Sequence, residues 1–183
     1  FKLPWSGRGV DYTEEDIQFV ADAMRNADPL TGGTYLREFE AAFSEYHGGI
    51  SSFAVASCTA ALELAAVLSG VGPGDEVVIP AHTYCATAIP FAGRGARIVW
   101  ADIDPDFRVV TADTLASRIT PKTKVVVVVH LYGLAARMDE IVQLAEEKGI
   151  LVVEDCAQAI GAAYNGRKVG TFGDLGCFSF HGQ

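Results

Sequence analysis

The sequence is poor in basic residues and in long apolar runs, and each shortage excludes a class of protein. Its 183 residues carry 14 lysines and arginines against 23 aspartates and glutamates, a formal net charge of -9. A nucleic-acid-binding surface is excluded because phosphate backbones require a basic partner. A polybasic membrane-surface patch is excluded for the same reason. The longest aliphatic run, residues 125–129, is far shorter than the roughly 20 residues of a membrane-spanning helix.

Cysteine is also scarce. The cysteines at positions 58, 85, 156 and 177 are far apart, form no C-x-x-C pair and have no nearby histidine pattern. This spacing predicts reduced packing thiols in a cytoplasmic protein, rather than disulfides or a metal site.

Strand-like and helix-like segments alternate along the chain. We expect helices over residues 13–26, 35–47, 60–69, 85–93, 111–119 and 138–148, and strands over 53–56, 76–80, 96–103, 124–130, 150–155 and 175–180, with residues 1–9 irregular. Asn165-Gly166 predicts a tight antiparallel hairpin within residues 163–169. The alternation predicts an α/β fold with a mostly parallel sheet flanked by helices.

The stretch ILVVEDCAQAIG, residues 150–161, is the centre of this pattern. Its continuous apolar run is typical of a parallel strand that is buried on both faces. Asp155 then falls at the carboxyl end of the strand, where open α/β sheets bind ligands. Burying a carboxylate without a hydrogen-bond donor or a cation costs on the order of several kcal/mol, so Asp155 needs a partner. The alternative is that Asp155 only caps the segment that follows.

Three other strand ends carry polar or aromatic groups. The run Ser57-Cys58-Thr59 lies between a short strand and a helix, where its residues either cap the helix or bind an anion at its N-terminus. Tyr84 follows the strand at 76–80 and is either a core residue or a ring contact. His130 ends the valine-rich strand and is either structural or a substrate contact.

Three of these strand ends offer complementary groups, namely hydroxyls at a helix N-terminus, an aromatic face and the Asp155 carboxylate, and a phosphorylated, aromatic, cationic heterocycle would use all three. Pyridoxal 5'-phosphate (PLP) is such a molecule: its phosphate suits Cys58 and Thr59 with Ser179, its ring suits Tyr84, and its protonated pyridine nitrogen suits Asp155. A nucleotide site of the Rossmann type is the rival, but no G-x-G-x-x-G follows any expected strand.

Several motifs together support a resemblance to a known family. In order and spacing, the sequence contains VASCTAALELA, GDEVVIPAHTYCAT, VVHLYG, VVEDCAQAIGA and VGTFGDLGCFSFHGQ. This series resembles the sugar and cyclitol aminotransferases of PLP-dependent fold type I, and the resemblance covers essentially the whole chain. It implies homodimers with shared active sites and a length roughly twice that of this chain (the factor is a family expectation).

The resemblance also implies roles for individual residues. Cys58, Thr59 and Ser179 would hold the phosphate, Tyr84 would stack on the ring, and Asp155 would pair with the pyridine nitrogen. Gln158, at a position that is often histidine in the family, would lie near the phenolic oxygen. The Schiff-base lysine is expected immediately after Gln183, outside the sequence.

The resulting hypothesis is a PLP-dependent aminotransferase that moves an amino group from glutamate or glutamine to a keto sugar nucleotide or a keto cyclitol. The expected domain content is an N-terminal segment and most of the PLP-binding large domain over residues 1–183, with a C-terminal small domain elsewhere in the protein. We expect either that the sequence is a truncated piece or that it stops where a modified lysine follows. The alternatives are a related dehydratase, with histidine in place of the lysine, and a non-catalytic family member.

Overall fold

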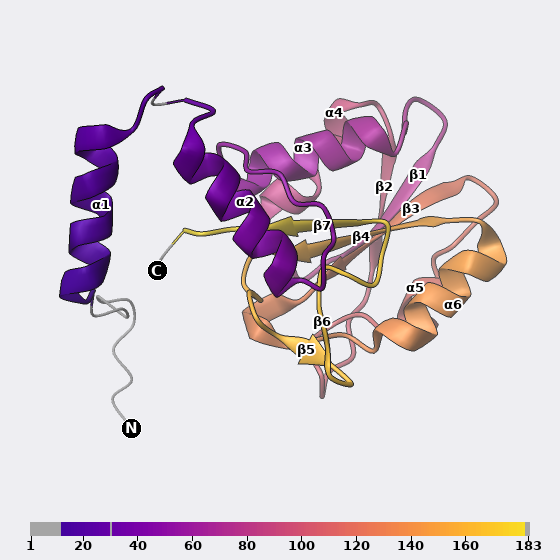
Figure 1. Ribbon diagram of the computed structural model, residues 1–183. Helices are drawn as coiled ribbons and strands as arrows, with labels where there is room; N and C mark the ends of the chain where they lie inside the picture. Colours follow the sequence, from indigo (N-terminus) through magenta and orange to yellow (C-terminus); the bar gives the residue numbers. More distant parts are fainter. Residues whose placement is uncertain (1–11, 30, 182–183) are drawn as a thin grey trace. The chain divides into compact units, whose positions relative to one another are not determined.

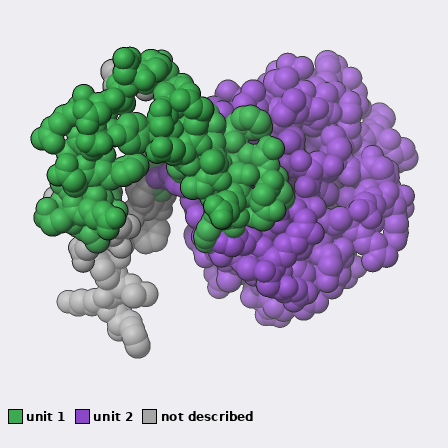
Figure 2. All heavy atoms as spheres, viewed as in Figure 1, with its two compact units in different colours: residues 1–54, 181–183 green, residues 55–180 purple. Residues whose placement is uncertain are grey.

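The computed structural model describes residues 12–29 and 31–181, so the expected irregular segment at 1–9 lies outside the described residues. The chain divides into two compact units (Figure 2), one formed by residues 1–54 with 181–183 and the other by residues 55–180. Every candidate site residue, from Cys58 to Ser179, belongs to the second unit.

The first unit contains the two helices that the apolar periodicity predicts. Helix α1 spans Glu14–Asn26 and α2 spans Thr34–Tyr46. Thr13 caps α1 by accepting a hydrogen bond from the Asp16 amide, and the Asp16 carboxylate accepts from the Thr13 amide in return. This capping box satisfies two backbone donors that a helix start would otherwise leave unpaired.

The second unit is built on a five-stranded sheet in the order β2-β1-β3-β4-β7. Its strands are β1 Glu76–Pro80, β2 Arg97–Ala101, β3 Thr123–Val129, β4 Leu151–Cys156 and β7 Leu175–Phe178. Every pairing between them is parallel. The short hairpin of β5 Ala163–Tyr164 and β6 Arg167–Lys168 is antiparallel, which confirms the prediction from Asn165-Gly166.

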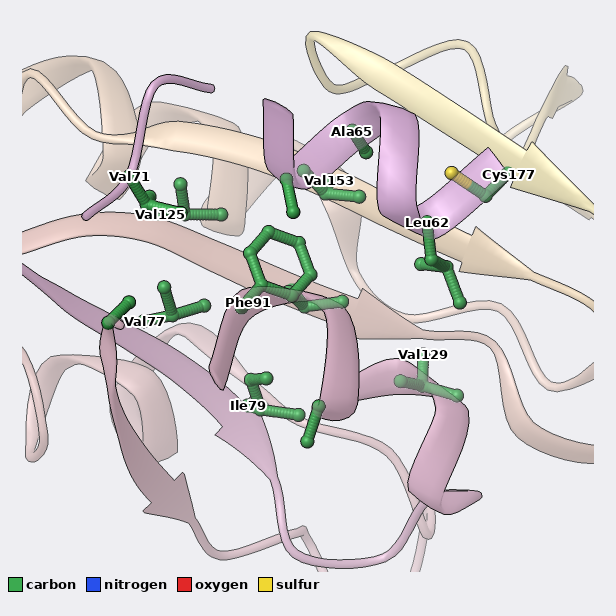
Figure 3. Packing of buried hydrophobic residues seen from close by; sticks show 14 of the residues in the cluster. Leu62, Ala65, Val71, Val77, Ile79, Phe91, Val125, Val129, Val153 and Cys177 are labelled. Carbon is green, nitrogen blue, oxygen red and sulfur yellow. The ribbon is translucent and has the colours of Figure 1, made fainter. Parts of the chain in front are cut away.

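Helices cover both faces of the sheet (Figure 1). Helices α3 Cys58–Leu68 and α4 Ile89–Gly93 lie on one face, and α5 Ala112–Ala116 and α6 Met138–Lys148 lie on the other. Figure 3 shows the Phe91 ring of α4 among the strand residues Val77, Ile79, Val125 and Val153, all of which are fully buried. Valines at even positions, such as 126 and 128, pack instead toward α5 and α6. This double burial explains why the strands are apolar at successive positions.

Two predictions about elements need correction. Residues 53–56 do not form a strand: Phe53 is 80% exposed, and the Ala54 amide donates to the Glu40 carboxylate instead of a neighbouring strand. The expected helix at 85–93 is divided into a single turn, η1 Cys85–Thr87, followed by α4. The break falls near Pro90, which lacks the N–H that a continuous helix would use.

Among the described helices, none combines the length and the apolar character needed to cross a bilayer.

Candidate active site

The carboxyl ends of the parallel strands meet at one edge of the sheet, and most candidate residues lie there. Asp155 is the fifth residue of β4, and its register neighbours are Val129 on β3 and Cys177 on β7. The N-terminal helix of this unit, α3, packs against β7 and against the η1 turn that Tyr84 precedes. The structure therefore brings the Cys58 helix, the Tyr84 turn and Asp155 around one strand edge, as the sequence predicts.

Asp155 is buried, with 4% of its surface exposed, and it does more than cap the segment that follows, because it also bonds to Thr87. Its Oδ2 accepts a hydrogen bond from the Thr87 hydroxyl at 2.8 Å, and its Oδ1 accepts from the Ala157 amide at 3.1 Å. Burial raises the pKa of the Asp155 carboxyl, although the hydrogen bonds from Thr87 and Ala157 offset part of the rise. The two donors thus do not fully replace the water that the carboxylate has lost.

The surroundings of Asp155 fit a cationic ligand. Among residues 12–29 and 31–181, the ion pairs involve Arg97, Lys124, His130 and Arg137, and none of them includes Asp155. A buried carboxylate without a cationic partner is unfavourable, and a charged N–H donor beside it would remove most of the penalty. A protonated pyridine nitrogen supplies such a donor.

The start of α3 offers anion-binding groups beside Asp155. Ser57 is the N-cap of α3, one of the residues that the sequence offers for capping, and its hydroxyl accepts a hydrogen bond from the Ala60 amide at 3.1 Å. Burial, and then the nearby Asp155 carboxylate, raises the pKa of the Cys58 thiol to about 12. Cys58 therefore stays a neutral thiol, and the exposed Thr59 places its hydroxyl in the first turn, where the helix dipole favours an anion.

Tyr84 and Gln158 lie at the rim of the same edge. Tyr84 is 72% exposed, so the alternative that it is a core residue is wrong. Gln158 is also exposed, and its Oε1 accepts a hydrogen bond from the Tyr132 amide at 3.0 Å. With Oε1 held in this way, the amide nitrogen of Gln158 is the group that can donate to a ligand.

Ser179 directly follows β7 and is half-buried. Because Cys177 pairs with Asp155 across the β4–β7 ladder, Ser179 lies just past the carboxyl end of that ladder. Burial is the main reason that the pKa of the Cys177 thiol is raised to about 12, so this cysteine is a packing residue, as the sequence predicts.

Thr87 and Glu154 are the contacts that sequence reasoning missed. Thr87 lies three residues beyond Tyr84, and its hydroxyl is within 2.7 Å of the Thr83 hydroxyl as well as bonded to Asp155. Nothing in the sequence connects residues 87 and 155. Glu154 gave a clearer signal, since a charged residue within an apolar strand must have partners.

His130, Glu154 and Cys156 are close enough together to be considered as metal ligands, with candidate atoms within 4.8 Å of one another. However, the His130 Nε2 bonds to Glu154 at 3.0 Å, and the His130 Nδ1 accepts from the Ala136 amide at 3.2 Å. Both ring nitrogens are thus occupied by protein groups. His130 is the structural residue that one of the two alternatives predicts.

Comparison with solved structures identifies the class of protein that this fold and site define. A putative sugar aminotransferase from Streptococcus pneumoniae, in its PLP form, matches all of the chain with a TM-score of 0.88 and 35% identity, and the chain covers 50% of it. The 3-amino-5-hydroxybenzoic acid synthase matches 94% of the chain with a TM-score of 0.86 and 32% identity, and the chain covers 45% of it. The fold is that of fold type I PLP-dependent aminotransferases, which confirms the predicted fold class.

The chain belongs to the DegT/DnrJ/EryC1/StrS aminotransferase family, whose model matches residues 10–183. PLP is the cofactor of this family, and the S. pneumoniae neighbour has been solved in both PLP and PMP forms. The resemblance inferred from the sequence motifs is thereby confirmed.

Curated relatives of the chain include enzymes that act on sugars and cyclitols. A GDP-perosamine synthase from Caulobacter vibrioides is 42% identical over 174 residues, which are 95% of this chain and 46% of the relative. An L-glutamine:2-deoxy-scyllo-inosose aminotransferase from Streptomyces kanamyceticus is 46% identical over 173 residues, 91% of this chain and 40% of the relative. The chain spans about half the length of the curated relatives it matches.

Proposed function

We propose that the protein containing this chain is a PLP-dependent aminotransferase that moves an amino group from glutamate or glutamine to a keto sugar nucleotide or a keto cyclitol. Membership of the aminotransferase family supports the reaction class. The names of the relatives support the substrate class, because they include a UDP-N-acetyl-3-dehydro-alpha-D-glucosamine 3-aminotransferase and the glutamine-dependent inosose enzyme. The structural observation that carries the proposal is Asp155, a buried carboxylate without an ion-pair partner in the described chain.

The roles of the site residues follow from their positions. Asp155 would hold the proton on the pyridine nitrogen, because a carboxylate in this buried setting favours a cation beside it. The amides at the start of α3, the Thr59 hydroxyl and Ser179 would bind the phosphate. Cys58 would contribute through its backbone, since its thiol remains protonated.

The remaining residues would orient the ring. Tyr84 would stack on its face, and Gln158 would donate its amide N–H toward the phenolic oxygen. When bound, PLP supplies the electron sink for a carbanion at the donor's α-carbon. Asp155 makes that sink effective by keeping the pyridine nitrogen charged, and Thr87 and Ala157 hold the carboxylate in place for that task.

The substitution Tyr84→Ala should weaken cofactor binding by about 0.5–1.5 kcal/mol, the worth of an aromatic stacking contact. Tyr84→Phe keeps the ring and should bind nearly as well as wild type. Both dissociation constants can be measured by titrating the full-length apoenzyme with PLP and following its absorbance. Equal losses in the two variants would mean that the hydroxyl, rather than the ring face, is the working group.

From the resemblance to the family, we propose that the residue after Gln183 is the lysine that binds the cofactor covalently. Borohydride reduction of the full-length protein, followed by peptide mapping, should find a pyridoxyl group on that residue. The intact mass should be well above the 19.4 kDa of this chain, because we propose a C-terminal small domain beyond it.

Two outcomes of the same experiment would contradict the proposal. An unmodified histidine at that position would favour the related dehydratase. A full-length protein without cofactor absorbance, even after incubation with PLP, would favour a non-catalytic family member.

We further propose that the protein is a homodimer with shared active sites. Exposed apolar side chains support a contact surface: on α3, Leu64, Val67 and Leu68 are 49%, 50% and 70% exposed. Burying such residues against a second subunit is favourable at about 25 cal/mol per Å² of apolar surface. Sedimentation of the full-length protein would test whether it is a dimer. Assays with glutamate and with glutamine would test the proposed amino donor.

A further inference from the structure

One buried ionisable pair has no part in the proposed cofactor contacts. Glu154 and His130 are both 0% exposed and lie 3.0 Å apart, between Glu154 Oε2 and His130 Nε2. Glu154 is next to Asp155 in β4, and successive residues of a strand point to opposite faces of the sheet. The pair therefore lies on the α5–α6 side of the sheet, away from α3.

Glu154 binds the backbone of residues 170–173, the segment that leads into β7. Its Oε1 accepts hydrogen bonds from the Phe172 and Gly173 amides, and its Oε2 accepts from the Gly170 amide, each at 2.7 Å. Burial by itself raises the pKa of the Glu154 carboxyl, but the bonds from His130 and these amides outweigh it, so the pKa is lowered. Glu154 is thus a buried anion around which residues 170–173 fold.

The hydrogen bonds of His130 fix its tautomer. Its Nδ1 accepts from the Ala136 amide, so the ring proton must lie on Nε2, from which it is donated to Glu154. A doubly protonated ring would place a second N–H against the Ala136 amide. His130 therefore links two segments, with one nitrogen for each.

The first segment leads to the phosphate side of the proposed site. Gly170 packs so closely on Phe178 that a Cβ there would collide with the ring, and a Cβ at Gly173 would lie 2.7 Å from the Val152 carbonyl. A displacement of residues 170–173 must therefore move Phe178, and Ser179 follows it directly.

The second segment leads to the phenolic-oxygen side. His130 holds the turn of residues 131–136 through Ala136, and within that turn Tyr132 adopts a φ of 56°. This conformation is unfavourable for tyrosine and requires support from its surroundings. The Tyr132 amide then holds the Gln158 side chain.

We propose that the Glu154–His130 pair is a positioning pair for the cofactor site, with Glu154 setting Ser179 through residues 170–173 and His130 setting Gln158 through the 131–136 turn. The inference rests on the proposed function, since it needs Ser179 and Gln158 to face PLP. In this proposal, residues on the α5–α6 side of β4 position the groups that bind the phosphate and the phenolic oxygen of the cofactor.

Two substitutions at one residue separate the two connections. His130→Asn keeps an acceptor where Nδ1 meets the Ala136 amide, but it removes the donor to Glu154. His130→Gln keeps an N–H near the Nε2 position, but it removes the acceptor for Ala136. The full-length apoenzyme of each variant would be titrated with PLP and with pyridoxal, which lacks the phosphate, and the absorbance of the bound cofactor would be followed against pH.

His130→Asn should raise the dissociation constant for PLP at least about tenfold, the worth of a charge-assisted hydrogen bond, and leave that for pyridoxal within about twofold. His130→Gln should leave the ratio of the two constants unchanged and move the midpoint of the absorbance titration by about half a pH unit or more. If the pair were purely structural, both variants would change the ratio of the two dissociation constants and the midpoint of the absorbance titration together. Equal changes in the two variants, or no change in either, would overturn the inference.

A second measurement needs no substitution. Because coupling between sites is reciprocal, PLP binding to the wild-type protein should slow amide hydrogen exchange at Gly170, Phe172 and Gly173 at least about twofold. Unchanged exchange at these amides would also overturn the inference. If wild-type protein binds no PLP in the first titration, the proposed function itself is wrong, which is decided before any variant is made.

Discussion

The substitution Asp155→Asn should reduce transamination at least about a hundredfold, because a neutral amide cannot keep the pyridine nitrogen protonated. Asparagine has the same shape and can be accommodated locally. Its Oδ1 can accept from the Ala157 amide as Asp155 does, and its Nδ2 can donate to the Thr87 hydroxyl. The Thr87 hydroxyl can then turn its proton toward Thr83, 2.7 Å away. The loss should therefore come from chemistry rather than from misfolding.

The same substitution, Asp155→Asn, should lower the activity without lowering the stability of the apoenzyme. Burial raises the pKa of Asp155, so the charged form of this residue disfavours the folded state at neutral pH. Asp155→Asn should leave the free energy of unfolding unchanged or raise it by up to about 1 kcal/mol. Urea unfolding of the apoenzyme and steady-state kinetics of the holoenzyme measure the two effects separately. The matched control Asp106→Asn, at an exposed aspartate, should change neither, and near-wild-type turnover in Asp155→Asn would contradict the assignment.

The substitution Glu154→Gln should have the largest effect on stability, lowering the free energy of unfolding by about 3 kcal/mol. A glutamine oxygen can still accept from the Phe172 and Gly173 amides. Its NH₂ group, however, would face the Gly170 amide and the His130 N–H, which are both donors. The control Glu146→Gln changes an exposed glutamate of α6 and should cost little.

The pH dependence provides a second readout for the same variant. The pKa of Glu154 is below the ordinary glutamate value of 4.5, so its contribution to stability is complete above that pH and is lost as the pH falls through the folded-state pKa. The difference in unfolding free energy between wild type and Glu154→Gln should therefore shrink as the pH is lowered from about 7 to below about 4. A difference that stays constant over this range would mean that Glu154 is not held as a carboxylate.

The strand at residues 151–156 and the position of Asp155 could be predicted because local signals agree there. The apolar run, the acid at its end and the following small residues all indicate a buried parallel strand with a polar tip. The segment at 53–56 gave a similar but weaker signal and was predicted wrongly. A four-residue strand depends on a partner rather than on its own propensity, and here the Ala54 amide bonds to Glu40 instead.

By itself, the sequence determined the α/β class, the family and the residues at the strand ends, because those follow from periodicity and from motifs of neighbouring residues. Only the tertiary structure decided that Thr87 holds Asp155, that Tyr132 holds Gln158, and that Glu154 gathers residues 170–173. These contacts join positions that are 68, 26 and 18 residues apart. A hydrogen bond depends on distances of tenths of an ångström and on the orientation of both partners, and these are set only when the strands pair and the loops pack.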